Sequence, residues 1–324
     1  MKLLPVLFTT SSLVFSVSAL ADLAPEEGLG GYVGLFLGYS SNQSNIDPNN
    51  TTHDGSNIDK SSGAAPLPVG ELTYTFGDDY DHQLFLGMAE DDLIEGMGVL
   101  QIGYQSELSD GSVIGISYMP TIGGTDLYSD PYASRLQRTK TKVKTHGVRL
   151  MGENLAGTPL SLEAAFANTT IDKEQSGQNL TAEQQQLLVR DARTYALKGS
   201  YLIEATQGVY LEPRLTYIRY DAKGSATAFH SIQPGVTITT FIERHQLSLS
   251  MDYAKRSYDE MNPIYAKKRS DDDFNSTLVY QYVDMFDWDD WTFVGSAGYG
   301  KQESNIDFFK GNETMIAAGV MYQF

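Results

Sequence analysis

The chain ends in the stretch ETMIAAGVMYQF, residues 313–324. Apolar side chains occupy every second position of it: Ile316, Ala318, Val320, Tyr322 and Phe324. The residues between them are mostly small or less apolar. Because successive side chains of a β-strand point to opposite faces, this alternation predicts a strand with one apolar face that ends on an aromatic residue.

The same alternation recurs along most of the sequence. We expect about 14 strands, each near the roughly 9–11 residues that a tilted membrane-spanning strand needs. A total of 12 to 16 strands is also compatible with the sequence, because residues 66–107 can be divided into strands in more than one way. The expected strands are 28–40, 66–76, 80–89, 97–107, 112–122, 142–152, 159–170, 191–204, 208–220, 228–242, 245–256, 273–284, 290–301 and 313–324.

The connections between these strands alternate in length. Short turns are expected at 77–79, 109–111, 153–158, 205–207 and 243–244, and long loops at 41–65, 123–141, 171–190, 257–272 and 302–312. Tyrosines and other aromatics fall near both ends of the apolar faces. Short turns on one side, long loops on the other and two aromatic girdles are typical of bacterial barrels. The sequence therefore predicts an all-β fold, a transmembrane antiparallel up-and-down β-barrel.

The N-terminus predicts export. Lys2 precedes apolar stretches at 3–8 and 13–17, and Ala19-Leu20-Ala21 fits a cleavage site. We expect residues 1–21 to be a signal peptide and residues 22–324 to form a single barrel in the outer membrane. The alternative, a membrane anchor, is disfavoured because polar residues interrupt the short apolar stretch.

The terminal strand resembles the C-terminal signature of bacterial outer-membrane β-barrels. That resemblance implies an assembly signal at Tyr322 and Phe324, read by the barrel-assembly machinery. The mature chain as a whole is similar to a domain-of-unknown-function family of Gram-negative outer-membrane barrels. The resemblance implies a porin-like channel but supplies no substrate and no functional residues.

Composition excludes several functions. The formal net charge is -18, so the chain lacks the basic surface that nucleic acids require. There is no cysteine, which excludes disulfides, thiolate metal sites and a cysteine nucleophile. Acidic residues cluster at 90–92 and 271–273, but no stretch has the ligand pattern of a calcium loop, so neither metal nor cofactor is expected.

Charged side chains at inward positions predict the lining of a pore. They are Arg149, Glu163, Lys198, Glu204, Glu212 and Arg214. Two interpretations remain open. Opposed charges could form a constriction with a transverse field, or the same residues could form a salt-bridge network that stiffens or plugs the lumen.

Three functions follow from this sequence. The first is a pore for passive diffusion of small hydrophilic solutes, with cation preference because the chain is acidic. The second is a closed structural barrel, or one whose loops bind surface ligands or lipopolysaccharide. The third is a lipid-acting outer-membrane enzyme. It is disfavoured, and no enzyme is expected, because the histidines 53, 82, 146, 230 and 245 lack catalytic partners at suitable spacing.

One outward stripe predicts lipid contact. Lys140, Lys142 and Lys144 alternate where a strand meets its long loop. Ammonium groups bind phosphate, so we expect these lysines to contact lipopolysaccharide. The alternative is a generic basic loop. The oligomeric state does not follow from the sequence.

Overall fold

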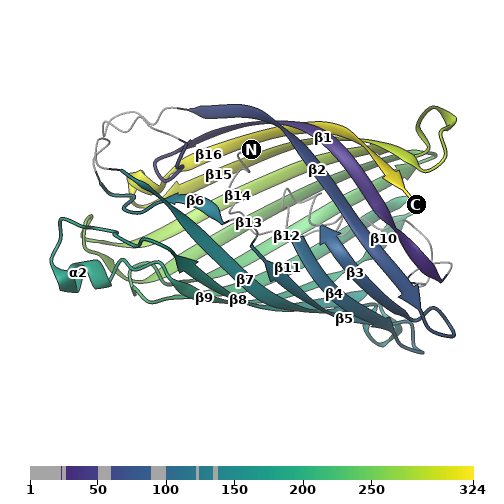
Figure 1. Ribbon diagram of the computed structural model, residues 1–324, viewed down its shortest axis with the longest axis horizontal. Helices are drawn as coiled ribbons and strands as arrows, with labels where there is room; N and C mark the ends of the chain where they lie inside the picture. Colours follow the sequence, from purple (N-terminus) through teal and green to yellow (C-terminus); the bar gives the residue numbers. More distant parts are fainter. Residues whose placement is uncertain (1–22, 24–26, 50–59, 89–99, 122–123, 134–137) are drawn as a thin grey trace.

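The computed structural model describes residue 23 and residues 27–49, 60–88, 100–121, 124–133 and 138–324. The predicted signal peptide, residues 1–21, lies outside the described residues, as does the acidic stretch 90–92. The described chain forms one antiparallel sheet that closes on itself as a barrel (Figure 1). The closure pairs β1 with β16, with Val33 opposite Tyr322 and Leu35 opposite Val320.

The strands follow one another around the barrel in chain order. Their bounds are β1 (Gly28–Ser44), β2 (Ser61–Phe76), β3 (His82–Met88), β4 (Leu100–Glu107), β5 (Val113–Pro120), β6 (Thr125–Tyr128), β7 (Lys140–Glu153), β8 (Leu160–Ile171), β9 (Ala192–Tyr201), β10 (Ile203–Thr206), β11 (Val209–Ala222), β12 (Phe229–Ile242), β13 (His245–Asn262), β14 (Lys267–Tyr282), β15 (Trp291–Ser304) and β16 (Gly311–Gln323). The described helices are short: η2 (Leu155–Gly157), α2 (Ala182–Gln186), η3 (Met285–Asp287) and η4 (Asp307–Phe309). None of the helices in the described part of the chain is long and apolar enough to cross a membrane.

The wall contains 14 strands, as the sequence predicts. β5 and β6 both pair with β7 and form one interrupted wall strand. β9 and β10 both pair with β11 and form another, interrupted at Leu202. The β8–β9 loop contains the short helix α2. Thr181 caps α2, and the reciprocal hydrogen bonds with Gln184 form a capping box.

The two faces of the wall differ as the alternation predicts. Outward side chains are apolar and exposed, whereas their strand neighbours point inward and are buried, as along β7, where Val148 and Leu150 are exposed and Arg149 is buried. Exposed tyrosines stand at both ends of this apolar face: Tyr39, Tyr118, Tyr195, Tyr217, Tyr253 and Tyr299 at one end, Tyr80 and Tyr201 at the other. An apolar band between two aromatic girdles suits a bilayer, and the chain is an outer-membrane β-barrel.

One end of the barrel carries the short turns and the C-terminus, and the other carries the long loops (Figure 1). We name them the turn end and the loop end. In bacterial barrels these are the periplasmic and extracellular ends.

The expected loop at 257–272 is wrong in extent. β13 continues to Asn262 and β14 begins at Lys267, so only residues 263–266 connect them. Asp271 and Asp273 are therefore strand residues on the inner face, and both are fully buried. Cations on the same and neighbouring strands neutralise them, which allows a highly charged stretch to remain a strand.

Two prolines of β2 lie where one edge of the strand has no partner among the described strands. Pro66 and Pro68 belong to the part of β2 that pairs only with β1 among the described strands, since β3 pairs with β2 from Glu71 onward. Proline cannot donate to a ladder, so an unpaired stretch tolerates it. The loop-end half of the wall thus lacks described strand pairing beside β2.

Candidate channel lumen and outer mouth

Three of the predicted charged residues meet on the inner face of neighbouring strands. Glu163 of β8 lies between Arg149 of β7 and Lys198 of β9. Its two carboxylate oxygens lie 3.3 Å from Arg149 Nε and 3.3 Å from Lys198 Nζ. All three side chains are largely buried, with 10–20% of each exposed. Opposite charges therefore neutralise one another along the wall.

Arg214 makes a second ion pair, with a residue that the sequence analysis did not single out. Its guanidinium donates to both carboxylate oxygens of Asp252, at 2.9 and 2.5 Å, and to Thr237 Oγ1 at 2.7 Å. The Arg214 side chain is 2% exposed and that of Asp252 is 5% exposed. A glycine makes room for this pair across β12, because a Cβ on Gly235 would lie 2.0 Å from Asp252 Oδ1.

Together these residues form what we call the polar belt: Arg149, Glu163, Lys198, Arg214 and Asp252. The belt follows β7, β8, β9, β11 and β13, and Gly235 of β12 lies beneath its last pair. Of the other predicted residues, Glu212 is buried two positions from Arg214 on the same face. Glu204 lies in β10 near the turn end and is exposed.

An apolar cluster lies on the other side of the lumen. Tyr32, Val279, Val294 and Met321 are buried together, with Phe36 and Val69 packed against them. These residues belong to β1, β2, β14, β15 and β16, which lie across the ring from β8 and β9. We name them the apolar cluster. The apolar cluster thus faces the polar belt across the lumen.

The loop end is crossed by a segment between β6 and β7, residues 128–133, which we name the mouth segment. Tyr132 inserts among aromatic rings from the β13–β14 and β15–β16 connections, with centroids 6.3 Å from Tyr265, 5.5 Å from Phe308 and 6.3 Å from Phe309. Those connections attach on the far side of the ring from β7. The mouth segment therefore spans the opening, and burial raises the pKa of the Tyr132 phenol.

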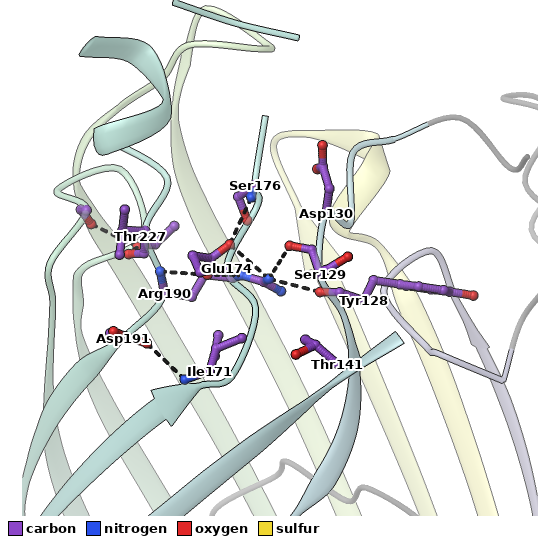
Figure 2. Close-up of polar contacts among 12 residues, drawn as sticks. Tyr128, Ser129, Asp130, Thr141, Ile171, Glu174, Ser176, Arg190, Asp191 and Thr227 are labelled. Carbon is purple, nitrogen blue, oxygen red and sulfur yellow. Dashed lines mark hydrogen bonds and ion pairs between the residues drawn. The ribbon is translucent and has the colours of Figure 1, made fainter. Parts of the chain in front are cut away.

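Arg190 anchors the near side of the mouth segment (Figure 2). Its guanidinium donates to Glu174 Oε2 at 2.8 Å and to the carbonyl oxygens of Tyr128 and Ser129 at 2.9 Å each. The Asp130 carboxylate accepts from the backbone N–H groups of residues 177 and 178, each at 3.1 Å. These contacts fix the mouth segment to the β8–β9 loop.

Arg138 anchors the far side. It donates to the carbonyl oxygens of Pro131 at 2.8 Å, Ala133 at 3.1 Å and Asn45 at 2.9 Å, the last in the β1–β2 connection. Asn45 in turn donates through Nδ2 to the carbonyl of Phe308 at 2.9 Å. Hydrogen bonds and ring contacts thus join the mouth segment to four other loop-end connections: β1–β2, β8–β9, β13–β14 and β15–β16.

A buried charge network continues from the mouth segment into the lumen. The Arg269 guanidinium carbon lies 3.5 Å from the centroid of Phe309 and 4.5 Å from that of Tyr258. Arg269 pairs with Asp271 at 2.6 Å, and Arg256 pairs with Asp273 at 3.0 Å. Sequence reasoning missed these residues because it placed Arg269 and Asp271 in a loop, and Arg256 and Asp273 at the strand ends beside that loop. Their alternate spacing across 269–273 was the available signal.

A family model, "protein of unknown function (DUF2860)", matches residues 28–323. The chain belongs to the DUF2860 family. No curated protein matches the sequence.

Several solved outer-membrane proteins resemble this DUF2860 protein in architecture. The anion-selective porin from Comamonas acidovorans is 10% identical, with 91% of this chain and 98% of the porin covered and a TM-score of 0.42. OmpT of Vibrio cholerae is 11% identical, with 93% and 99% covered and a TM-score of 0.44. The monoaromatic hydrocarbon channel CymD is 8% identical, with 92% and 89% covered and a TM-score of 0.48. None of their solutes or selectivities is assigned to this chain.

The three lysines expected to contact lipopolysaccharide lie exposed on the outer face at the loop end of this DUF2860 protein. Two of them have acidic neighbours on the same face. Lys142 Nζ lies 2.6 Å from Asp126 Oδ1, and Lys144 Nζ lies 2.9 Å from Asp172 Oδ1. Lys140 Nζ lies 3.5 Å from Asn49 Oδ1. A phosphate would have to compete with these carboxylates.

The predicted assembly signal lies at the barrel closure. Tyr322 stacks between Trp291, at 5.2 Å, and Phe324, at 6.4 Å. The backbone of Phe324 exchanges two hydrogen bonds with Gly31 of β1, at 3.0 and 3.1 Å. The terminal residues therefore complete the seam between the first and last strands, and their role in assembly remains a prediction.

One histidine has a serine nearby that sequence spacing did not indicate. His82 Nδ1 lies 3.0 Å from Ser106 Oγ and 2.9 Å from Tyr104 OH, and Nε2 lies 3.6 Å from Asp81. Two hydroxyl groups share one ring nitrogen, so Tyr104 competes with Ser106 for it. This arrangement suits an interfacial hydrogen-bond cluster better than a nucleophile with its base.

Proposed function

We propose that this DUF2860 protein is a passive outer-membrane channel for small hydrophilic solutes that prefers cations. The observation that carries the proposal is the charge of the inner wall. Away from exposed strand ends, inward positions of the described strands hold more carboxylates than cations. The carboxylates are Glu71, Glu107, Glu153, Glu163, Glu212, Asp252, Asp271, Asp273 and Glu313; the cations are Arg149, Lys198, Arg214, Arg256 and Arg269.

The physical reason for cation preference is the low-dielectric wall. Charge lining such a cleft raises the local concentration of counter-ions, and salt screens the effect. Arg149, Lys198 and Arg214 are each engaged with a carboxylate, so the pairs contribute little net field. The excess of inward carboxylates over inward cations on the described strands sets the sign of the potential along the path.

Pairing along the wall also bears on the two interpretations of the predicted pore-lining residues. A transverse field needs opposite charges on facing walls, whereas the polar belt pairs them on neighbouring strands and faces the apolar cluster. This arrangement favours the salt-bridge network over the constriction. We propose that the belt stiffens the wall and that Glu212 adds to the acidic potential beside it.

The second candidate function is a closed barrel that acts through its loops. The mouth segment favours it, because Tyr132, Arg138 and Arg190 join loops across the opening. In that case neither the native protein nor a variant with a released mouth segment would conduct.

Reconstituted liposomes separate the two functions. A channel should make liposomes swell in small neutral sugars, and a salt gradient across a bilayer should give a reversal potential of cation-selective sign that declines as salt rises. Absence of swelling in the native protein and in Tyr132→Ala would favour the closed barrel. An anion-selective reversal potential would refute the cation preference.

A further inference from the structure

The turn between β14 and β15, residues 283–290, differs from the other short turns. It exposes two large aromatic side chains, Phe286 at 72% and Trp288 at 56%. Phe286 is the most exposed large apolar residue in the described part of the chain. In Figure 1 this turn extends beyond the wall at the turn end, on the same side as the C-terminus. A role in the channel lumen does not explain why these two rings are exposed.

The backbone of this turn is strained in a way that displays those rings. Asp284, Phe286, Asp287 and Asp290 all have positive φ, between 47° and 67°. Positive φ is rare for a bulky residue such as Phe286 and is unfavourable for its backbone. Arg244 stabilises the conformation by donating to the Asp284 carbonyl at 3.2 Å and to Asp287 Oδ1 at 2.6 Å. The backbone preferences of these residues alone would not select this turn conformation.

The exposed rings continue the aromatic girdle that faces the bilayer. Phe286 lies edge-on to Tyr282 at 6.1 Å and to Trp288 at 6.1 Å. Tyr282 stacks on His245 at 4.9 Å, on the outer face of β13. Both tryptophans of the chain, Trp288 and Trp291, belong to this girdle. Tryptophan concentrates at the level of lipid headgroups, so the turn extends an interface that is already in contact with lipid.

The charge around the rings is negative. Four aspartates flank the aromatic pair: Asp284, Asp287, Asp289 and Asp290. Asp287 is paired with Arg244, which is the only cation in the short turns that the structure describes. Carboxylates beside exposed aromatic faces favour a positively charged amine, because ring faces attract ammonium groups and the carboxylates neutralise them. The same surface disfavours an anionic headgroup.

We infer that the β14–β15 turn is a binding site for phospholipid headgroups that carry a positively charged amine, such as phosphatidylethanolamine. Phe286 and Trp288 lie at the headgroup level of the leaflet at the turn end, where their ring faces and the carboxylates of Asp289 and Asp290 face the ammonium group. The site does not depend on whether the barrel conducts. A cation–π contact at an exposed position contributes about 0.5–1 kcal/mol, which corresponds to a preference of about two- to fivefold over an anionic lipid.

Tryptophan fluorescence tests this site in the full-length folded protein. Trp291→Phe leaves Trp288 as the only tryptophan and keeps a ring beside Tyr322. The protein is reconstituted in phosphatidylcholine nanodiscs, and brominated phosphatidylethanolamine or brominated phosphatidylglycerol is titrated in as quencher. We expect half-maximal quenching of Trp288 at a mole fraction of phosphatidylethanolamine about two to five times lower than of phosphatidylglycerol.

A second variant separates headgroup recognition from insertion of the rings. Asp289→Asn/Asp290→Asn, in the Trp291→Phe background, should lower the preference and retain quenching, because the carboxylates are lost and the rings are kept. Asparagine also tolerates the positive φ of Asp290. The matched control is Asp78→Asn/Asp79→Asn in the β2–β3 turn, which should keep the preference. Equal quenching by both lipids in all variants, or stronger quenching by phosphatidylglycerol, would overturn the inference. Absence of quenching would also overturn it, because Trp288 would then lie outside the leaflet.

Discussion

Replacing Asp252 by leucine should destabilise the barrel by about 3–5 kcal/mol, because it leaves the Arg214 charge buried without its carboxylate. The size of the effect follows from burial, since the Arg214 side chain is only 2% exposed and its remaining contacts are Thr237 Oγ1 and Ser250 Oγ. Two hydroxyl groups do not neutralise a guanidinium. The measurement is urea unfolding of the folded protein in detergent micelles, followed by tryptophan fluorescence.

The double variant Arg214→Met/Asp252→Leu tests the reason for this loss. Replacing both partners of a buried pair by apolar residues of similar volume is often neutral or stabilising, so most of the stability should return. The matched control is Glu303→Leu, which removes the partner of Lys301 from an exposed pair in which both side chains are about half exposed. That variant should lose less than about 1 kcal/mol. If Asp252→Leu lost no more than Glu303→Leu, water would have to reach the polar belt, and the buried-pair reasoning would be refuted.

Four further outcomes are expected. Tyr132→Ala, which removes the ring that joins loops across the opening, should raise single-channel conductance, whereas Tyr118→Ala on the outer face should not. Burial raises the pKa of the Tyr132 phenol. The closed mouth is therefore fully stabilised below the ordinary tyrosine pKa, and it is weakened as the pH rises through the raised pKa. Conductance should increase above about pH 10, and it should increase less in Tyr132→Phe. Changing Lys140, Lys142 and Lys144 to Gln should reduce the amount of copurified lipopolysaccharide. The loss of binding free energy should be less than the roughly 1 kcal/mol per lysine of an unpaired ammonium, because Asp126 and Asp172 compete with the phosphates. Equal destabilisation of the variant in neutral detergent would refute lipid contact. Deleting Phe324 should lower the heat-modifiable folded fraction in the outer membrane, and unchanged assembly would contradict its role as a signal.

The sequence predicts the wall because the bilayer imposes one rule on every strand. Side chains such as Leu35 and Val320 must face lipid, and their neighbours must face inward, so a period of two identifies each strand and its two faces. The same rule places Arg149, Glu163, Lys198 and Arg214 on the inner face. Their pairing follows from register, which alternation alone does not supply across the tilted wall.

The sequence does not predict the loop-end contacts. Charged strand residues such as Asp271 and Asp273 look like loop residues until their partners Arg269 and Arg256 are known. Tyr132 meets Phe309 and Tyr265 across the ring, between loops that share no periodicity and lie far apart in the chain. Such contacts depend on barrel diameter and loop path, and neither is encoded locally.

Single-channel recording of the purified protein in a planar bilayer tests the central proposal most directly. A channel predicts discrete conductance steps for the native protein, a cation-selective reversal potential in a salt gradient, and larger steps for Tyr132→Ala. Absence of steps from correctly folded native protein and from Tyr132→Ala alike would contradict the account and identify a barrel that does not conduct.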